Sequence, residues 1–159
     1  MDRVTHLIRT LNLAPHPEGG AFCEVFRSHQ GVVAPDGARR AAVTAIYFLL
    51  TEGQKSRWHR VAHDEIWHFC EGDPLELLLL HPELDRVERH MLGPLDGSAA
   101  PLVPIPGGSW QAARPTGGYT LVACTVAPGF EYRDFALMGD QPDVATKLLS
   151  RFPDLGELL

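Results

Sequence analysis

The most informative stretch of the chain, Gly53–Gly72, reads GQKSRWHRVAHDEIWHFCEG. It places His59, His63 and Glu65 at the turn between two strand-like runs. Histidine and glutamate side chains are ligands for zinc, iron, manganese or nickel. A histidine beside a glutamate is equally a pair that transfers protons without a metal, because histidine titrates near neutral pH. These residues alone leave both interpretations open.

The second half of this stretch predicts which side chains face the interior. Side chains alternate between the two faces of a strand, so Glu65, Trp67 and Phe69 share one face and His68 takes the other. Trp67 and Phe69 are large and apolar, so we expect that face to be the inner one. A buried carboxylate needs a partner, and His59 is the nearest one in sequence. We therefore expect His59 and Glu65 to point into one cavity, and His68 to point away from it.

Strand signals continue on both sides of the stretch. Apolar, β-branched and aromatic runs recur about every 8–12 residues between Gly, Pro and Asp, a pattern typical of a sandwich or barrel. The chain has 15 Gly and 13 Pro, which favours many tight turns such as Pro35–Gly37. The expected strands are Phe22–Ser28, Ala42–Leu50, Ile66–Phe69, Leu75–His81, Val87–Leu92, Leu102–Ile105, Gln111–Ala113 and Tyr119–Val126.

An amphipathic helix is expected at each end of the chain. Residues 2–12 and 142–152 carry apolar side chains at helical spacing, and Pro15 and Pro153 end the two patterns. No repeat or linker interrupts the chain. The sequence therefore predicts an all-β fold: one domain over residues 1–159, with a barrel core at about 20–138 and a short helix at each end.

Composition excludes several classes of partner. Asp and Glu outnumber Lys and Arg by 20 to 14, for a net charge of −6, so nucleic acid is not an expected partner. No apolar run approaches the length of a membrane span, and the first residues lack the apolar core of a signal peptide. The three cysteines are widely spaced and form no CxxC pair, which is typical of the reducing cytoplasm.

The Gly53–Gly72 stretch resembles the first motif of the cupin superfamily, G(X)5HXH(X)3–4E(X)6G. The spacing matches from Gly53 through His59 and Glu65 to Gly72, but Val61 stands at the position of the second histidine. A valine cannot bind a metal, so this departure removes one ligand of the metal site that the motif implies.

A later segment is similar to the second cupin motif, PXG(X)2H(X)3N. Pro106–Gln111, PGGSWQ, keeps its spacing, but Gln111 replaces the histidine and Pro115 replaces the asparagine. Of the four ligands that the superfamily implies, only His59 and Glu65 remain by identity. A bound divalent transition metal would therefore depend on His59, Glu65 and Gln111, and no cofactor is the expected state.

Longer blocks resemble the small, uncharacterised cupin-5 subfamily of bacteria and fungi. The resemblance implies a double-stranded β-helix barrel, often homodimeric, related to sugar-nucleotide epimerases; it implies no particular reaction. The blocks are Pro17–Ser28 (PEGGAFCEVFRS), Ala45–Leu50 (AIYFLL), Ser56–Leu80, Pro106–Arg114 (PGGSWQAAR) and Val122–Leu137.

Polar residues near the two motifs are candidate ligand contacts. Arg57 and Arg114 flank them, and an arginine holds a carboxylate or phosphate with two parallel hydrogen bonds. His63 lies in the turn, and Gln111 offers an amide. We expect these four side chains to bind a small molecule, carbohydrate-like or anionic. His16 shows no pattern that pairs it with a partner, and the Pro17–Ser28 block shows no pairing of a nucleophile with a base.

Three functions agree with these residues. The first is a metal-independent isomerase or epimerase in which His59 transfers a proton, Glu65 orients it, and Arg57 and Gln111 hold the substrate. The second is a metal-dependent oxygenase or lyase with the reduced ligand set. The third is a ligand-binding or sensory module without catalysis. The fold cannot choose among them, because one fold serves many functions.

Overall fold

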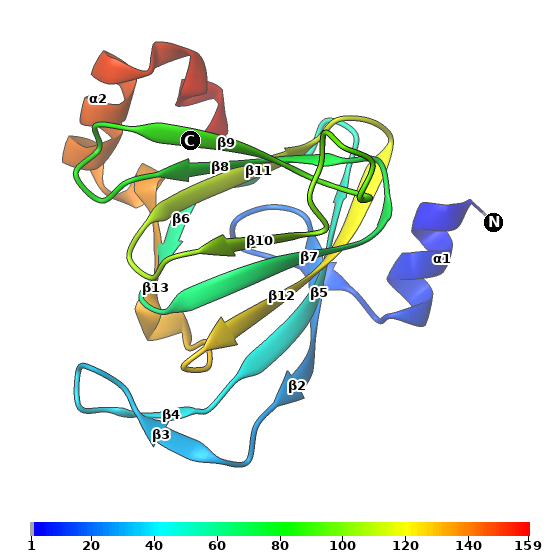
Figure 1. Ribbon diagram of the computed structural model, residues 1–159, viewed down its shortest axis with the longest axis horizontal. Coiled ribbons are helices and arrows are strands. Elements are labelled where there is room, and N and C mark those ends of the chain that lie inside the picture. Colours follow the sequence, from blue (N-terminus) through cyan, green and yellow to red (C-terminus); the bar gives the residue numbers. More distant parts are fainter. Residues whose placement is uncertain (1) are drawn as a thin grey trace.

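The computed structural model describes residues 2–159 and has the two facing sheets of a jelly roll (Figure 1). In the described chain the larger sheet has six strands, in the order β1 (Ala14–Pro15), β2 (Ala21–Arg27), β5 (Thr44–Thr51), β12 (Tyr119–Ala127), β7 (Asp64–Gly72) and β10 (Leu102–Ile105). The smaller sheet has five, in the order β13 (Phe135–Leu137), β6 (Ser56–Val61), β11 (Trp110–Pro115), β8 (Leu75–Leu80) and β9 (Val87–Leu92). Each of these strands pairs antiparallel with its neighbours, which confirms the expected all-β jelly roll.

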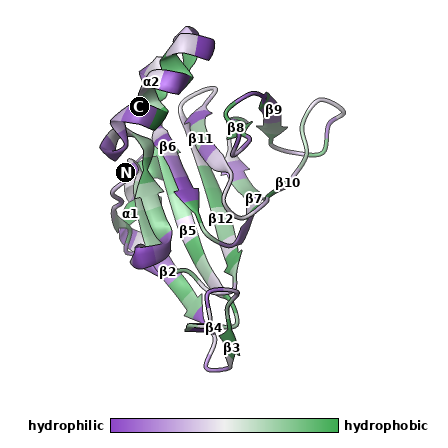
Figure 2. Cartoon of the chain, turned by 90° about the vertical axis from the view of Figure 1, so that its left-hand side faces the viewer, coloured by the Kyte–Doolittle hydropathy of each residue, from purple (hydrophilic) through white to green (hydrophobic). Residues whose placement is uncertain are grey.

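Each α-helix packs on the outer face of one sheet, and α1 (Arg3–Thr10) covers only part of the larger sheet, over β2, β5 and β12. This helix begins at Asp2, whose carboxylate caps the backbone N–H of Thr5, and it packs Leu7 onto the larger sheet. α2 (Pro142–Arg151) packs Leu148 onto the smaller sheet. Figure 2 shows hydrophilic residues on both helices and hydrophobic ones along the strands. No helix among residues 2–159 is long and apolar enough to cross a membrane.

The strand β8 shows why both faces of the smaller sheet are apolar. Its sequence LELLLL sends Leu75, Leu77 and Leu79 into the core between the sheets. Leu78 and Leu80 point the other way and pack with Trp58 and Trp110 beneath α2 and the 3-10 helix η3 (Pro153–Leu158). Trp58 also donates from Nε1 to the carbonyl of Leu155 at 3.1 Å. Burial on both faces therefore explains the nearly unbroken leucine run.

The elements that the pattern does not predict are short. β1, β13 and the hairpin of β3 (Gly31–Val33) and β4 (Arg39–Ala41) have two or three residues per strand, too few for a period-2 signal. The turn expected at Pro35–Gly37 joins β3 to β4. Two further 3-10 helices, η1 (Tyr132–Asp134) and η2 (Met138–Asp140), flank β13.

The register of the strands brings the motif residues together. His59 on β6 lies opposite Gln111 on β11, and Glu65 on β7 lies opposite Val126 on β12. Trp67 follows on the inner face of β7, opposite Cys124. The two motifs thus meet at one end of the space between the sheets.

Substitution of the two glycines that bracket the first motif should lower the stability of the fold by different amounts. Gly53 and Gly72 both have positive φ, +76° and +99°. A Cβ at Gly72 would lie 2.3 Å from the carbonyl oxygen of Tyr119, whereas a Cβ at Gly53 would meet nothing within 4 Å. We expect Gly53→Ala to lower the free energy of unfolding by about 1 kcal/mol, the cost of a left-handed alanine, and Gly72→Ala to lower it by clearly more. Urea denaturation of both variants measures this, and equal losses would contradict it.

Candidate functional site

A cavity of about 100 Å³ opens at this end of the barrel. Its wall combines aromatic, acidic and imidazole side chains from both sheets and from the loops beside them. The lining residues are His16, Glu18, Phe22, Glu24, Arg27, Thr44, Ile46, Phe48, His59, Val61, Glu65, Trp67, Cys124, Val126, Phe130, Glu131, Tyr132 and Phe135.

His59 has its proton positions fixed by its neighbours. Its Nδ1 lies 2.7 Å from the carbonyl oxygen of Arg57, and because a carbonyl only accepts, Nδ1 carries a proton and donates it. Nε2 faces Oε2 of Glu18 at 3.1 Å. The side chain is buried, and this burial lowers the pKa of His59 below its usual value, although the charge of Glu65 acts in the opposite direction. A neutral His59 therefore presents the lone pair of Nε2 to Glu18.

Glu18 is the partner that the sequence analysis missed. Its Oε1 accepts from the hydroxyl of Ser56 at 2.8 Å, and its Oε2 lies 3.5 Å from Nδ1 of His16. Burial raises the pKa of Glu18 to about 7. With Nδ1 of His59 protonated, Glu18 and His59 hold a proton between Oε2 and Nε2 near neutral pH.

The strap that carries Glu18 is tied to β6. Residues 16–20 join β1 to β2, and the backbone N–H of Arg57 donates to the carbonyl of Glu18 at 2.8 Å. The Arg57 side chain donates from Nη2 to the carbonyl of Pro17 at 2.5 Å. His16 lies beside Glu18, and burial lowers the pKa of this histidine. The sequence signal is a histidine and a glutamate two residues apart before Gly19–Gly20, and spacing alone does not connect it to β6.

Glu65 reaches the cavity from the opposite sheet, as the alternation along β7 predicts. Only 7% of the residue is exposed, and Nε2 of Gln111 donates to its Oε2 at 2.5 Å. Burial raises the pKa of Glu65 to about 7, while the nearby His59 acts to lower it. His59 and Glu65 line the same cavity, but the expected direct pairing between them is wrong: in the described chain the carboxylate that contacts His59 is Glu18.

Gln111 stands behind Glu65 and does not line the cavity. Its two amide atoms are both engaged, since Oε1 accepts from Nε1 of Trp67 at 2.9 Å while Nε2 donates to Glu65. Gln111 therefore orients Glu65, and the expected direct contact with a ligand is not supported by its place in the fold.

The other three expected ligand contacts also lie outside the cavity lining. Arg57 holds the strap. Arg114 forms ion pairs with Glu76, at 2.7 Å, and with Glu157. His63 lies behind η1, where its Nε2 is 3.6 Å from Asp134. Proximity to a motif in sequence therefore gave the wrong position for these side chains.

His68 occupies the outer face of the larger sheet, as alternation predicts. Its Nε2 lies 2.7 Å from the hydroxyl of Thr125, and the residue does not line the cavity. Of the three tryptophans near the motifs, Trp67 alone lines the cavity; Trp58 and Trp110 pack beneath α2.

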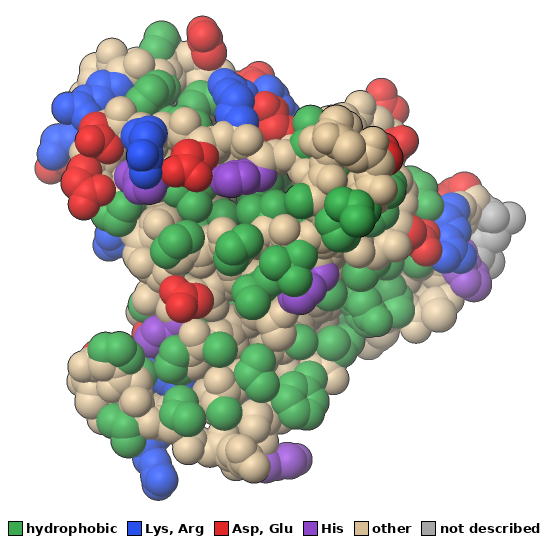
Figure 3. All heavy atoms as spheres, viewed as in Figure 1, with side chains coloured by type: hydrophobic (Ala, Val, Ile, Leu, Met, Phe, Trp, Pro, Cys, Tyr) green, Lys and Arg blue, Asp and Glu red, His purple; other side chains and the backbone are tan. Residues whose placement is uncertain are grey.

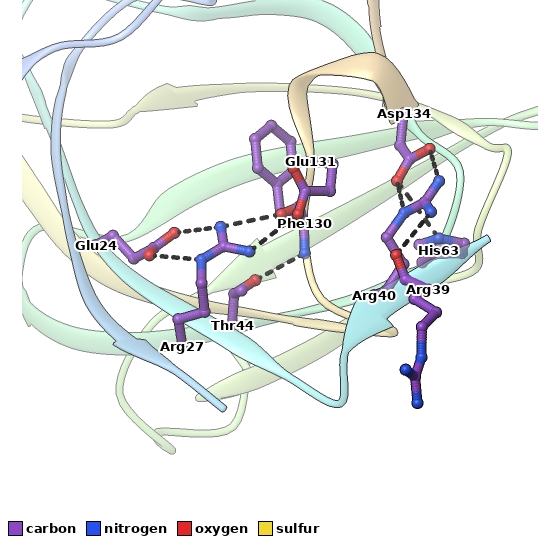
Figure 4. A network of polar contacts seen from close by, with 9 residues as sticks. All are labelled: Glu24, Arg27, Arg39, Arg40, Thr44, His63, Phe130, Glu131 and Asp134. Carbon is purple, nitrogen blue, oxygen red and sulfur yellow. Dashed lines mark hydrogen bonds and ion pairs between the residues drawn. The ribbon is translucent and has the colours of Figure 1, made fainter. Parts of the chain in front are cut away.

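An ion-pair group that the sequence does not reveal surrounds the mouth of the cavity (Figure 4). Arg27 donates to Glu24 at 2.8 and 2.9 Å, to Glu131 at 3.3 Å and to the carbonyl of Phe130 at 3.1 Å. Residues three apart on a regular strand face opposite ways. A bulge in β2 between Glu24 and Phe26 adds the residue that brings Glu24 and Arg27 together.

The donor set in the cavity does not fit a transition-metal centre. Val61 occupies one expected ligand position and lines the wall with methyl groups. Gln111, the third ligand of the reduced set, has both amide atoms occupied. Within residues 2–159 no group of three or more His, Cys, Asp or Glu side chains has the arrangement of a metal site. A catalytic metal needs at least three protein ligands, and of the four positions that the cupin motifs supply this wall keeps only His59 and Glu65.

Comparison with known proteins gives a family and a fold. Residues 5–138 match the family model Cupin_5, described as Cupin superfamily (DUF985). A hypothetical protein from Leishmania major is 32% identical, with a TM-score of 0.85, over 99% of this chain and 96% of that one. A protein from Shewanella oneidensis is 31% identical, with a TM-score of 0.83, over 99% and 95%.

More distant structures share the fold alone. Oxalate decarboxylase from Bacillus subtilis is 13% identical with a TM-score of 0.60, over 91% of this chain and 36% of that one. Comparison with curated proteins gives no match. The family model covers most of the chain, and the two closely similar structures extend over nearly all of it, so the chain belongs to the Cupin_5 family of the cupin superfamily.

Proposed function

We propose that this cupin binds a small, carbohydrate-like molecule in the cavity and transfers a proton on it without a metal ion, in an isomerase- or epimerase-like reaction. The observation that carries the proposal is the contact of His59 Nε2 with Glu18 Oε2 at 3.1 Å, inside a cavity that also holds a second carboxyl group with a raised pKa. Groups with a pKa near the working pH are efficient proton donors and acceptors.

Two proton-transfer groups on different walls match the needs of such a reaction. Epimerisation beside a carbonyl requires one group to remove a proton and another to return one to the same carbon. The His59–Glu18 pair enters from the smaller sheet and the strap, and Glu65 enters from the larger sheet. Ser56 and Gln111 orient the two carboxyl groups by donating hydrogen bonds to them. In this scheme Glu18 orients His59, the role that the sequence had predicted for Glu65.

A homodimer is the second part of the proposal, and its contact is the outer face of the larger sheet. Hydrophobic side chains gather over β7, β10 and β12 in Figure 3. Leu102 is 48% exposed and lies opposite His68, while Ile66 lies opposite Pro104. A second copy placed on this face would cover that apolar surface and the edge strand β10.

The reducing cytoplasm stays a prediction. Cys23, Cys70 and Cys124 are free thiols in the structure, which supports a reducing compartment.

Solvent exchange tests the proton transfer. We expect a sugar or sugar derivative from a screened panel to exchange a C–H proton for deuterium in the presence of the enzyme, as followed by NMR. Removing one partner of a proton-transfer group costs about 100-fold or more, so His59→Gln, Glu18→Gln and Glu65→Gln should each slow exchange by that factor. His68→Gln, which changes a histidine outside the cavity, should exchange at the native rate. A panel compound that binds in the cavity without exchanging would identify a binding module instead.

Elemental analysis tests the metal-independent mechanism. We expect protein made without a histidine tag to contain substoichiometric zinc, iron, manganese and nickel, because Val61 and Gln111 cannot complete a ligand set. The comparison is with His59→Ala made in the same way. One equivalent of a transition metal in the native chain that is lost in the variant would overturn this part of the proposal.

Light scattering tests the dimer. We expect the native chain to have twice the monomer mass at micromolar concentration, and Leu102→Asp to be monomeric because it places a charge in the apolar contact. The control is Leu95→Asp, since Leu95 is 83% exposed in a loop between β9 and β10. A native monomer, or a Leu102→Asp variant that remains dimeric, would contradict the proposed contact.

A further inference from the structure

The geometry points to a positive charge on the small molecule that the cavity binds, carried by an amine or a quaternary ammonium group. This inference rests on the proposed role of the cavity in binding a small molecule and adds the charge of that molecule. It replaces the earlier expectation of an anionic ligand, whose arginines lie elsewhere.

Charge is the first argument. Among the described lining residues the carboxyl groups number four, Glu18, Glu24, Glu65 and Glu131, and the guanidinium group is that of Arg27. Arg27 is already engaged by Glu24, Glu131 and the carbonyl of Phe130, as Figure 4 shows. No cation of the described wall is left to hold an anion, and an anion would meet carboxylates at the mouth and in the interior.

Aromatic geometry is the second argument. The rings of Phe130, Tyr132 and Phe135 stand at 69–81° to one another, with centroids 5.1–6.3 Å apart. The face of an aromatic ring attracts an ammonium ion that lies within about 6 Å of the ring centroid, so this cluster of rings favours a cation over an anion. Tyr132 is 54% exposed, so this three-ring corner lies where a ligand enters.

The lack of a cationic partner for Glu65 is the third argument. Its hydrogen bonds come from neutral groups, the Gln111 amide at 2.5 Å and the Cys124 thiol, and no Lys or Arg of residues 2–159 pairs with it. Glu65 lines the cavity and is only 7% exposed. Ionising its carboxyl group therefore costs free energy unless a positive charge lies beside it. An ammonium group beside this carboxyl would supply that compensation, and its alkyl part would pack on Trp67 and Phe48, whose rings meet edge to face with centroids 5.9 Å apart.

The titratable groups that line the cavity determine how the affinity for such a cation depends on pH. Burial raises the pKa of Glu18 and of Glu65 to about 7, and it lowers the pKa of His16 and of His59. Glu24, Arg27 and Glu131 at the mouth complete the charged lining. As pH rises from 6 to 8 the buried carboxyls ionise, so the affinity for a cation should rise by about tenfold for each carboxyl that contacts it. A neutral ligand should bind with much less dependence on pH.

Three probes of one shape but different charge test the inference. They are choline, its neutral analogue 3,3-dimethylbutan-1-ol and the anionic 3,3-dimethylbutanoate, titrated into the full-length protein and followed by tryptophan fluorescence and calorimetry. We expect choline to bind at least about tenfold more tightly than the alcohol at pH 8, and the carboxylate to bind most weakly. Choline binding at pH 7 should release protons to the buffer.

Charge-removing variants locate the effect. Glu65→Gln should lower the affinity for choline by at least about tenfold and leave the affinity for the alcohol unchanged. Glu131→Gln removes a carboxylate at the exposed mouth and provides a second variant if Glu65→Gln folds poorly. Glu52→Gln removes the same charge from an exposed position outside the cavity and should leave both ligands unaffected.

Equal affinity for choline and the alcohol, preference for the carboxylate, or no binding of choline would each overturn the inference. The proposed proton transfer fails by a different result, the absence of deuterium exchange from bound sugars. Selective choline binding without any exchange would therefore retain the cation site and remove the catalytic proposal.

Discussion

Burial of two carboxyl groups without a cation of their own is the constraint on which the site depends. Glu18 and Glu65 are both removed from water, and burial raises the pKa of each to about 7. The barrel meets this cost with hydrogen bonds, from Ser56 to Glu18 and from Gln111 to Glu65. The charged and neutral forms of each group are therefore close in free energy at neutral pH, and a bound molecule can move a proton with little work.

The fold keeps these groups in place by tying loops to strands. Arg57 holds the strap that carries Glu18, and the buried guanidinium of Arg40 holds η1 by two bonds of 2.8 Å to Asp134. Figure 4 shows the contact of Arg40 with Asp134; Arg40 also donates to Asp36 in the turn of the β3–β4 hairpin at 3.0 Å, so the hairpin and η1 are linked. Breaking a buried pair of this kind leaves an uncompensated charge, so the Arg40–Asp134 pair favours the position of η1 beside the cavity.

Period-2 alternation was enough to predict the part of the site that lies on one strand. It placed Glu65 and Trp67 inside and His68 outside, and the same rule would have placed Arg114 outside, three residues beyond Gln111 on β11. The contact of Glu18 with His59 joins residues far apart in the chain through a strap without periodicity, and no local pattern encodes it. The pairing of Glu24 with Arg27 depends on a bulge, which inverts the alternation after it. Long runs of alternating side chains therefore predict the sheets. The polar contacts of the site depend on a loop and a β-bulge, which local patterns do not encode.

The two departures from the cupin motifs are related through Glu65. Where the motif has a histidine that would bind a metal, Gln111 uses one end of its amide to donate to Glu65 and the other to accept from Trp67. A carboxylate on a metal ion has its charge neutralised, whereas Glu65 receives hydrogen bonds only from neutral groups, Gln111 and Cys124, and keeps a raised pKa. Val61 adds an apolar surface at the remaining position, which lowers the local polarity and favours the protonated acid. The same scaffold positions that would hold a Lewis acid thus hold a proton donor and acceptor, and the enclosed carboxyl is left to interact with whatever positive charge a ligand brings.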